Sequence, residues 1–245
     1  MEAQFQNKVV VITGGATGIG LEAAKRFVTE GAFVFITGRR QELLDKVVKE
    51  IGSNIRAVNA DSGRREDVEW LFKIVEEEKG QIDILLSNAG TGGFGFPIGG
   101  ITEEHYERVF DTNIRGSILT VQGALPLLKD GGAIVLTGSI SSVKSYETMS
   151  VYCASKAALR TFSKIWAIEL KSRKIRINIV SPGPTETAQL TDLSKELQDQ
   201  VVAPIPLGRA GKSEDIVNAI TFLASEKASF ITGTEMFVDG GASLV

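Results

Sequence analysis

The chain has 245 residues, 43% of them hydrophobic and 23% charged, with a formal net charge of −3 at pH 7. This composition is that of an ordinary globular protein, and it gives no reason to expect nucleic acid or an anionic membrane as a partner. The chain contains one cysteine and one histidine, which together exclude an intrachain disulfide and a zinc site built from nitrogen and sulfur ligands.

The ends and apolar runs of the chain predict its compartment. Residues 1–8 lack the basic and apolar regions of a secretory signal. No apolar run approaches the roughly 18 residues that a membrane span needs. We therefore expect a cytoplasmic protein without a metal site.

The first half of the chain alternates β-branched apolar runs with amphipathic stretches. Runs that end in glycine or polar residues are typical of buried parallel strands, and apolar residues at helical spacing indicate helices between them. The predicted strands are 8–13, 32–37, 55–59 and 82–87, and the predicted helices are 18–31, 41–51 and 64–79.

The second half opens with a glycine-rich stretch over 90–100, which leads to Thr102 as a predicted N-cap. The predicted helices that follow are 102–129, 150–173, 190–202 and 213–225, and the predicted strands are 133–137, 175–180 and 235–239. This strand–helix alternation runs through 1–245 without a linker, so it predicts one α/β domain. We expect a doubly wound Rossmann-type parallel sheet of about seven strands with helices on both faces.

The first strand-to-helix turn is rich in glycine. Its sequence, Thr13-Gly-Gly-Ala-Thr-Gly-Ile-Gly20, lets backbone amides approach a pyrophosphate at the positive end of the following helix. The spacing differs from G-x-G-x-x-G, and no Lys-Ser/Thr follows as in a P-loop. A tight turn between two elements is the alternative reading, but the position directly after the first strand favours nucleotide binding.

Tyr152 and Lys156 are four residues apart on a predicted helix, so their side chains lie on the same face. A free tyrosine has a pKa of about 10, and a nearby ammonium group lowers it by favouring the phenolate. Taken alone, such a pair is more often an ordinary helix tyrosine beside a solvated lysine. An acid–base role therefore needs further residues in support.

The second strand ends in Gly38-Arg39-Arg40, where NAD-binding proteins commonly carry a carboxylate that binds the ribose 2′-hydroxyl. Arginine instead forms charge-assisted bonds with a 2′-phosphate. The sequence therefore favours NADP(H) over NAD(H).

These motifs, in this order, resemble the compact type of the short-chain dehydrogenase/reductase family. The resemblance rests on the turn Thr13–Gly20, on Ser87-Asn-Ala-Gly90 with a departure at Ser87, and on Asn113. It extends to Ser139 after the fifth strand, to Tyr152-x3-Lys156, and to Pro182-Gly-x3-Thr187 after the sixth strand.

The resemblance implies four catalytic residues. Tyr152 would exchange a proton with the substrate oxygen, and Ser139 would bind the same oxygen. Lys156 would also hold the nicotinamide ribose, and Asn113 would order a water that relays protons.

The resemblance and the glycine turn together predict the cofactor and substrate contacts. The cofactor-binding residues would be Gly14, Thr17, Gly18, Ile19, Gly20, Gly38, Arg39, Arg40, Asp61, Ser62, Asn88, Ala89, Gly90, Tyr152, Lys156, Pro182, Gly183, Thr185 and Thr187. The substrate would meet Ser139 and an apolar lining of Phe94, Phe96, Val143, Tyr146, Met149, Leu190 and Leu193, with a lid around 188–207. Few fixed charges in that lining favour an apolar ketone or keto ester.

Other interpretations stay open. A 3-oxoacyl-[acyl-carrier-protein] reductase would need a basic docking patch, for which the sequence offers Lys171, Arg173, Lys174 and Arg176. An NADP-binding regulatory protein without turnover is the alternative that is not an enzyme. Cys153 is expected to be a packing residue and His105 a surface side chain. The resemblance also implies a homotetramer that pairs the helices predicted at 102–129 and 150–173.

Overall fold

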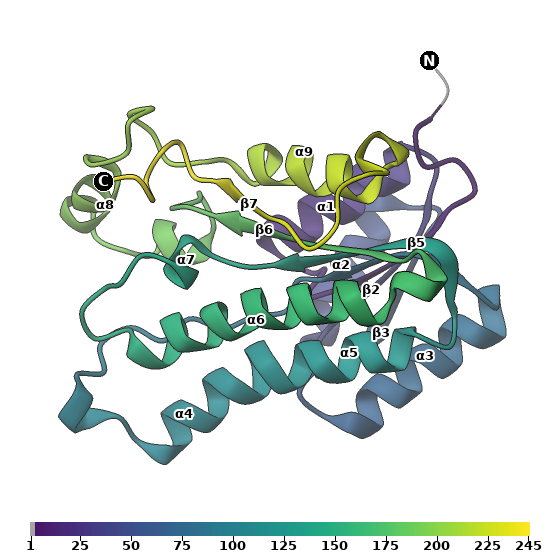
Figure 1. Ribbon diagram of the computed structural model, residues 1–245, viewed down its shortest axis with the longest axis horizontal. Helices are drawn as coiled ribbons and strands as arrows, with labels where there is room; N and C mark the ends of the chain where they lie inside the picture. The colour runs from purple at the N-terminus through teal and green to yellow at the C-terminus, as the bar shows by residue number, and fades with distance from the viewer. Residues whose placement is uncertain (1–2) are drawn as a thin grey trace.

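The computed structural model describes residues 3–245, and within them seven parallel strands form one sheet (Figure 1). The strand order is β3-β2-β1-β4-β5-β6-β7. The strands are β1 Val9–Thr13, β2 Phe33–Gly38, β3 Ile55–Asn59, β4 Ile82–Ser87, β5 Leu128–Thr137, β6 Arg176–Pro182 and β7 Glu235–Val238. The predicted fold class, a doubly wound Rossmann-type α/β sheet, is confirmed.

Helices cover both faces of the sheet (Figure 1). The α-helices are α1 Gly18–Thr29, α2 Gln41–Ile51, α3 Arg65–Lys79, α4 Glu103–Phe110, α5 Gly116–Ala124, α6 Ser150–Glu169, α7 Ala188–Thr191, α8 Lys195–Val202 and α9 Ser213–Ala224. Short 3-10 turns occur at η1 Ile98–Gly100, η3 Ile140–Ser142, η4 Lys171–Arg173 and η5 Glu226–Ala228, and one π-helical turn, η2 Asp111–Arg115, joins α4 to α5. No helix within residues 3–245 is both long and apolar enough to cross a bilayer.

The sheet separates two hydrophobic cores, because successive residues of a strand point to opposite faces. In β1, Val10 and Ile12 belong to the core that includes residues of α1 and α9, whereas Val9 and Val11 belong to the core that includes residues of α3, α5 and α6. Strand order reverses between β1 and β4, and ligands of doubly wound sheets bind outside the carboxyl ends of the strands at such a reversal.

The helix predicted over 102–129 ends earlier, at Ala124. Pro126 has no backbone N–H to continue the helical hydrogen bonds, and Leu128 already pairs with Ile82 in the sheet. As a result, β5 begins at Leu128 instead of Ala133, with a register irregularity against β4.

Two further predicted helices are interrupted. The helix predicted over 150–173 ends at Glu169, and a 3-10 turn follows, with Lys174 in a left-handed conformation. The helix predicted over 190–202 consists of α7 and α8, because Ser194 starts a new helix by accepting a hydrogen bond from the Leu197 amide. Apolar spacing alone could not show either break.

Candidate active site

The glycine turn is held against the end of β4 by side-chain hydrogen bonds. The Thr13 hydroxyl accepts hydrogen bonds from the amides of Asn88 (3.0 Å) and Ala89 (3.1 Å). In return, Asn88 Nδ2 donates to the carbonyl oxygens of Thr13 (3.2 Å) and Gly14 (3.1 Å). Gly14 has a φ of +68°, and a Cβ there would lie 3.0 Å from Ala89 Cα, so both the conformation and the space favour glycine.

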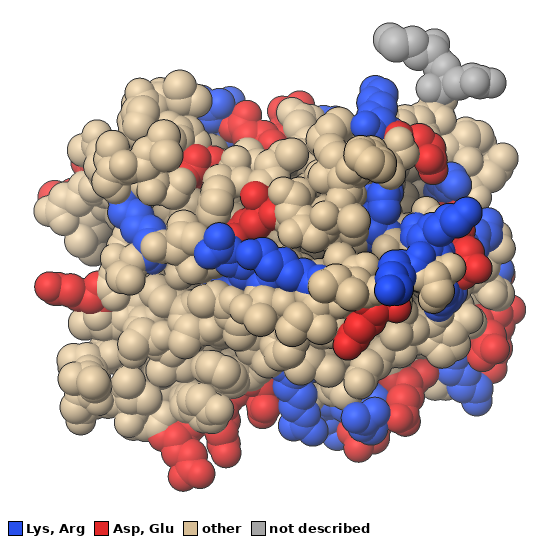
Figure 2. Space-filling view, in the orientation of Figure 1, with Lys and Arg blue, Asp and Glu red and all other residues tan. Residues whose placement is uncertain are grey.

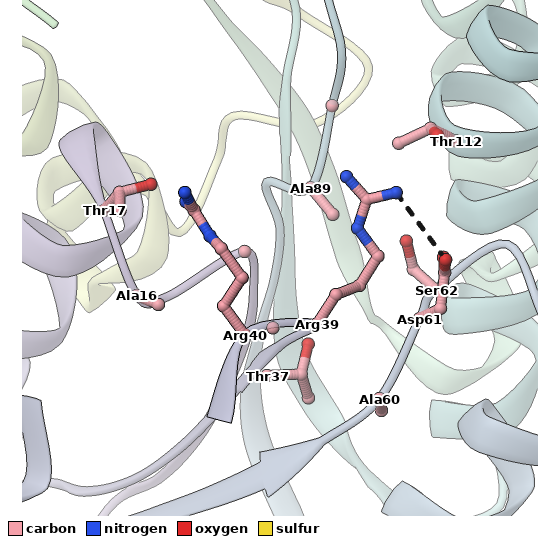
Figure 3. A pocket seen from close by; sticks show the side chains of 13 residues that line it. Ala16, Thr17, Thr37, Arg39, Arg40, Ala60, Asp61, Ser62, Ala89 and Thr112 are labelled. Atoms are coloured by element: carbon pink, nitrogen blue, oxygen red, sulfur yellow. Dashed lines mark ion pairs between the residues drawn. The ribbon is translucent and has the colours of Figure 1, made fainter. Parts of the chain in front are cut away.

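A cavity of about 360 Å³ opens between this turn and the ends of β2 and β3 (Figure 3). Its lining residues are Gly14, Ala16, Thr17, Thr37, Gly38, Arg39, Arg40, Ala60, Asp61, Ser62, Ala89, Gly90 and Thr112. Arg39 lies toward Asp61, with Nη1 3.8 Å from Asp61 Oδ2, whereas Arg40 lies on the side of Ala16 and Thr17 (Figure 3).

The first cavity fits the adenosine half of a dinucleotide. The glycine backbone forms one wall, and α1 begins there. Within residues 3–245, the side chain of the N-cap residue Thr17 does not bond the first backbone amides of α1. Its first amides are therefore available to an anion. Two guanidinium groups form the opposite wall, so the walls favour a ligand that carries phosphate.

A second cavity, of about 420 Å³, shares Thr17 and Gly90 with the first. It is lined from the glycine turn by Thr17, Gly18 and Ile19, and from the strand ends by Asn88, Gly90, Thr91, Phe94, Thr137, Gly138, Ser139, Ile140, Ser141, Pro182, Gly183, Pro184, Thr185 and Thr187. The remaining lining residues are Tyr146, Met149, Tyr152, Lys156, Ala188, Leu190, Leu193 and Val201. Residues far apart in sequence thus meet in one cavity at the carboxyl edge of the sheet.

Ser139, Tyr152 and Lys156 lie together in this second cavity. Burial raises the pKa of Tyr152, and the neighbouring Ser139 hydroxyl partly offsets this by lowering it. The net shift of this pKa is therefore opposite to the lowering expected from a neighbouring ammonium group. The lysine Nζ is 5.8 Å from the centre of the Tyr152 ring and donates to the Thr137 carbonyl oxygen at 3.0 Å.

Lys156 is itself almost completely buried, with 5% of its surface exposed. Burial lowers its pKa from 10.5 to about 8, because the charged form loses hydration. At neutral pH the ammonium form therefore still predominates, which is the form that a stabiliser of negative charge requires.

Asn113 is fully buried in the π-helical turn η2. Its Oδ1 accepts from the Thr91 amide (2.8 Å), and its Nδ2 donates to the Thr91 carbonyl oxygen (3.1 Å) and to Ser155 Oγ (3.0 Å). A Cβ on Gly90 would lie 3.4 Å from Asn113 Oδ1 and 3.5 Å from Lys156 Nζ. The asparagine and the lysine thus converge beside Gly90.

Four residues that were predicted to contact the substrate line the second cavity: Phe94, Tyr146, Met149 and Leu190. Leu193, from the predicted apolar lining, lines it as well. Phe96 and Val143 do not. The Phe96 ring instead stacks on His105, with 3.7 Å between the ring centres, and Val143 is 46% exposed. Val201 of α8 is an additional lining residue, so both α7 and α8 contribute to this wall.

Several lining residues were missed in the sequence. Thr137 is the last residue of β5 and Gly138 follows it, so their position at the end of a strand was an available signal. Thr112 lies in the π-helical turn, which has no sequence signature. Ser155, the partner of Asn113, could have been found only from the three-dimensional packing of η2 against α6.

His105 is buried, with 3% of its surface exposed, so its prediction as a surface residue is wrong. The side chain packs between Phe96 and Gly93 of the loop after β4, and Arg108 Nη2 lies 3.3 Å from His105 Nδ1. The spacing of apolar residues in α4 gives no sign of the loop that covers His105.

This environment predicts an acid-sensitive stability. Burial, and then the Arg108 charge, lower the pKa of His105 in the folded state. As the pH falls through the unfolded value of about 6.5, the unfolded chain takes up a proton that the folded chain refuses, so this contribution to stability is lost toward acid. In urea unfolding at about pH 8 and about pH 5, His105→Phe should lose less free energy of unfolding on acidification than the wild type. The same loss in both proteins would refute this.

The basic run 171–176 does not form a docking patch at the cavity. Arg176 is buried and donates to the carbonyl oxygens of Leu223 (2.7 Å) and Ser225 (3.1 Å) at the end of α9. Arg173 donates to the Leu125 carbonyl oxygen (2.8 Å) and contacts Asp130 (2.8 Å). The run also lies at the start of β6, so it is at the amino ends of the strands, whereas the cavities are at their carboxyl ends.

Within residues 3–245, no group of three or more His, Cys, Asp or Glu side chains is arranged to hold a metal ion.

Comparison with known proteins agrees with this geometry. Residues 14–243 match the family model described as enoyl-(acyl carrier protein) reductase. The chain is 45% identical to oxidoreductase asL5 of Sarocladium schorii, covering 99% of this chain and 98% of that protein. It is 34% identical to a 3alpha-hydroxysteroid dehydrogenase of Mediterraneibacter gnavus, covering 99% of both.

Solved structures are similar over almost the whole chain. A short-chain dehydrogenase/reductase of Serratia marcescens has a TM-score of 0.93 and 31% identity, covering 98% of this chain and 99% of that chain. A 3-ketoacyl-(acyl-carrier-protein) reductase of Brucella melitensis, solved with NADH, has a TM-score of 0.92 and 33% identity at the same coverage.

Proposed function

This chain belongs to the short-chain dehydrogenase/reductase family, and from that premise we propose that it is an NADP(H)-dependent reductase of apolar ketones or keto esters. Membership of the family makes it an oxidoreductase that acts on alcohol and carbonyl groups. The nicotinamide cofactor supplies or accepts the hydride when it is bound.

The observation that carries the proposal is the convergence of Ser139, Tyr152 and Lys156 in one cavity that begins at the glycine turn. In this arrangement Tyr152 donates a proton to the substrate oxygen, and Ser139 donates a hydrogen bond to the same oxygen. Lys156, held by the Thr137 carbonyl oxygen, provides the positive charge that stabilises the phenolate left on Tyr152.

We assign Asn113 a supporting role in this chemistry. Its amide ties the Thr91 backbone to η2 and to Ser155, and we assign it the role of ordering a water that returns protons toward Lys156. Residues 188–207, which include α7 and α8, are assigned as the lid of the single domain.

The preference for NADP(H) rests on Arg39 and Arg40 in the first cavity and on the absence of a carboxylate at the end of β2. Asp61 lies after β3, and its contact with Arg39 orients that guanidinium group at the cavity wall. The Brucella melitensis relative was solved with NADH, so the proposed preference for NADP(H) needs its own test.

Phe94, Tyr146, Met149, Leu190, Leu193 and Val201 give the second cavity an apolar wall. The experiment that tests the proposal is the oxidation of NADPH by the purified protein with a panel of ketones, keto esters and acyl-thioesters. Turnover with apolar ketones or keto esters is the expected result. No NADPH-dependent turnover with any of them would contradict the proposal.

An acyl-carrier-protein reductase is the second candidate, favoured by the family model and by the Brucella melitensis relative. Preference for acyl-thioesters in the same panel would select it. Any turnover excludes the third alternative, a regulatory protein that only binds NADP(H). We also propose a cytoplasmic location for this enzyme, since the single cysteine of the sequence, Cys153, is free.

We predict a homotetramer in solution. Ile165 and Ile168 on α6 and Tyr106 on α4 are about half exposed or more, at 47%, 65% and 48%. Figure 2 shows a band of uncharged surface across this face, bordered by charged side chains above and below. Pairing of these helices between subunits would bury the exposed apolar side chains. Light scattering at micromolar concentration should give a mass close to four times 26.3 kDa. A clean monomer would defeat this prediction and leave the proposed chemistry intact.

A further inference from the structure

Glu235 opens the edge strand β7, yet its carboxylate is buried, with 6% of the side chain exposed. Its Oε1 accepts hydrogen bonds from Ser142 Oγ (2.5 Å) and Ser181 Oγ (2.7 Å). Its Oε2 lies 2.9 Å from Arg160 Nε in an ion pair whose N–H is not directed at the oxygen. An uncompensated buried carboxylate is costly, so these three partners are needed together.

The three partners of Glu235 come from three of the elements around the second cavity, η3, α6 and β6. Ser142 ends the 3-10 turn η3, which directly follows Ser139. Arg160 is on α6, two helical turns after Tyr152. Ser181 directly precedes Pro182 and Gly183 in the cavity wall.

The backbone turn that carries Ser139 couples its position to that of Ser142. The Ser141 amide donates to Ser139 Oγ (3.1 Å), and the Ser142 amide donates to the Ser139 carbonyl oxygen (2.9 Å). Behind the turn, a Cβ on Gly138 would lie 2.3 Å from Ser181 Oγ, so the backbone already packs tightly there. Displacement of Ser142 must therefore displace Ser139.

We propose that Glu235 is a positioning residue whose carboxylate ties the Ser139 turn to the helix of Tyr152 and so fixes the relative placement of the two hydroxyl groups. The inference rests on the proposed function, because it requires Ser139 and Tyr152 to act on the same substrate oxygen. Glu235 itself lines neither of the two cavities.

The test compares Glu235→Gln with the wild type and with Glu78→Gln, a control that removes a surface ion pair of 3.1 Å to Arg56. Misplacing a catalytic group by about 1 Å costs up to about a hundredfold in rate, so kcat should fall by about ten- to a hundredfold in Glu235→Gln. NADPH affinity should stay unchanged, and Glu78→Gln should match the wild type. Wild-type kcat in Glu235→Gln would overturn the inference.

A double-mutant cycle separates positioning from general structural damage. In a Ser139→Ala background the group being positioned is gone, so Glu235→Gln should cause little further loss of kcat. An equal fold-loss in both backgrounds would show that the residue acts on the fold and not through Ser139, and would overturn the inference.

A milder pair of variants keeps the test usable if Glu235→Gln unfolds. Ser142→Ala should lower kcat in the same direction, and Ser142→Thr, which keeps the hydroxyl, should restore it. Equal kcat in both would overturn the inference. Failure of the proposed function is a distinct result, because it would appear as no turnover in the wild type or as full turnover in Tyr152→Phe.

Discussion

Replacing Tyr152 with phenylalanine should lower kcat by about 10²–10⁴, the usual contribution of a general acid or base. The substitution keeps the ring in the second cavity and removes only the hydroxyl that exchanges the proton. NADPH affinity should barely change, because the cofactor contacts of the glycine turn and the arginines are untouched. The measurement is steady-state kcat together with an NADPH binding titration.

The matched control is Tyr106→Phe on α4, where the ring stacks on Phe110 and is 48% exposed. This variant should retain wild-type kcat. If Tyr152→Phe kept more than about a tenth of wild-type kcat with chemistry rate-limiting, its hydroxyl could not supply the smallest expected acid–base contribution. Tyr152 would then not be the acid.

Removing Arg39 should raise KM for NADPH by about ten- to a hundredfold, because one charge-assisted bond is worth roughly 1.5–3 kcal/mol. KM for NADH should move little, since that cofactor lacks the 2′-phosphate. Arg39 is 70% exposed, so the NADPH effect should weaken as salt rises. Arg40 lines the same cavity, and the double variant should therefore lose more than either single variant.

Arg64→Ala is the matched control, since this arginine is 68% exposed, pairs with Asp67 and does not line the first cavity. It should leave both KM values unchanged. Comparison of kcat/KM for the two cofactors across wild type and variants decides the matter. Preference of the wild type for NADH, or equal losses with both cofactors, would overturn the assignment of these arginines.

The local sequence pattern was sufficient to predict the bounds of an element where one face of that element packs on the core along its length. The predictions 41–51, 55–59 and 82–87 agree with α2, β3 and β4 residue by residue. Each has a clear apolar pattern, and each either ends in a polar residue or is followed directly by glycine, as α2 is by Gly52. The placement of the site followed from the same information, because parallel strands present their carboxyl ends at one edge.

What could not be predicted depends on contacts between distant segments. The burial of His105 depends on a loop that folds over it, with Phe96 stacked on its ring. The sequence presents Glu235 as an ordinary charged residue at the start of an edge strand, and only the packing of α6, η3 and β6 around it supplies its partners. The position of Lys156 Nζ likewise depends on its hydrogen bond to the Thr137 carbonyl oxygen, which no spacing specifies.

We propose that this protein transfers a hydride between NADP(H) and a carbonyl carbon, and an isotope label on that hydrogen tests the proposal. NADPH labelled with deuterium at nicotinamide C4, on each face in turn, would be incubated with the protein and its best ketone from the panel. We expect that one of the two labelled cofactors gives an alcohol with deuterium on its carbinol carbon, as seen by mass spectrometry. An alcohol without deuterium from both labelled cofactors would contradict it.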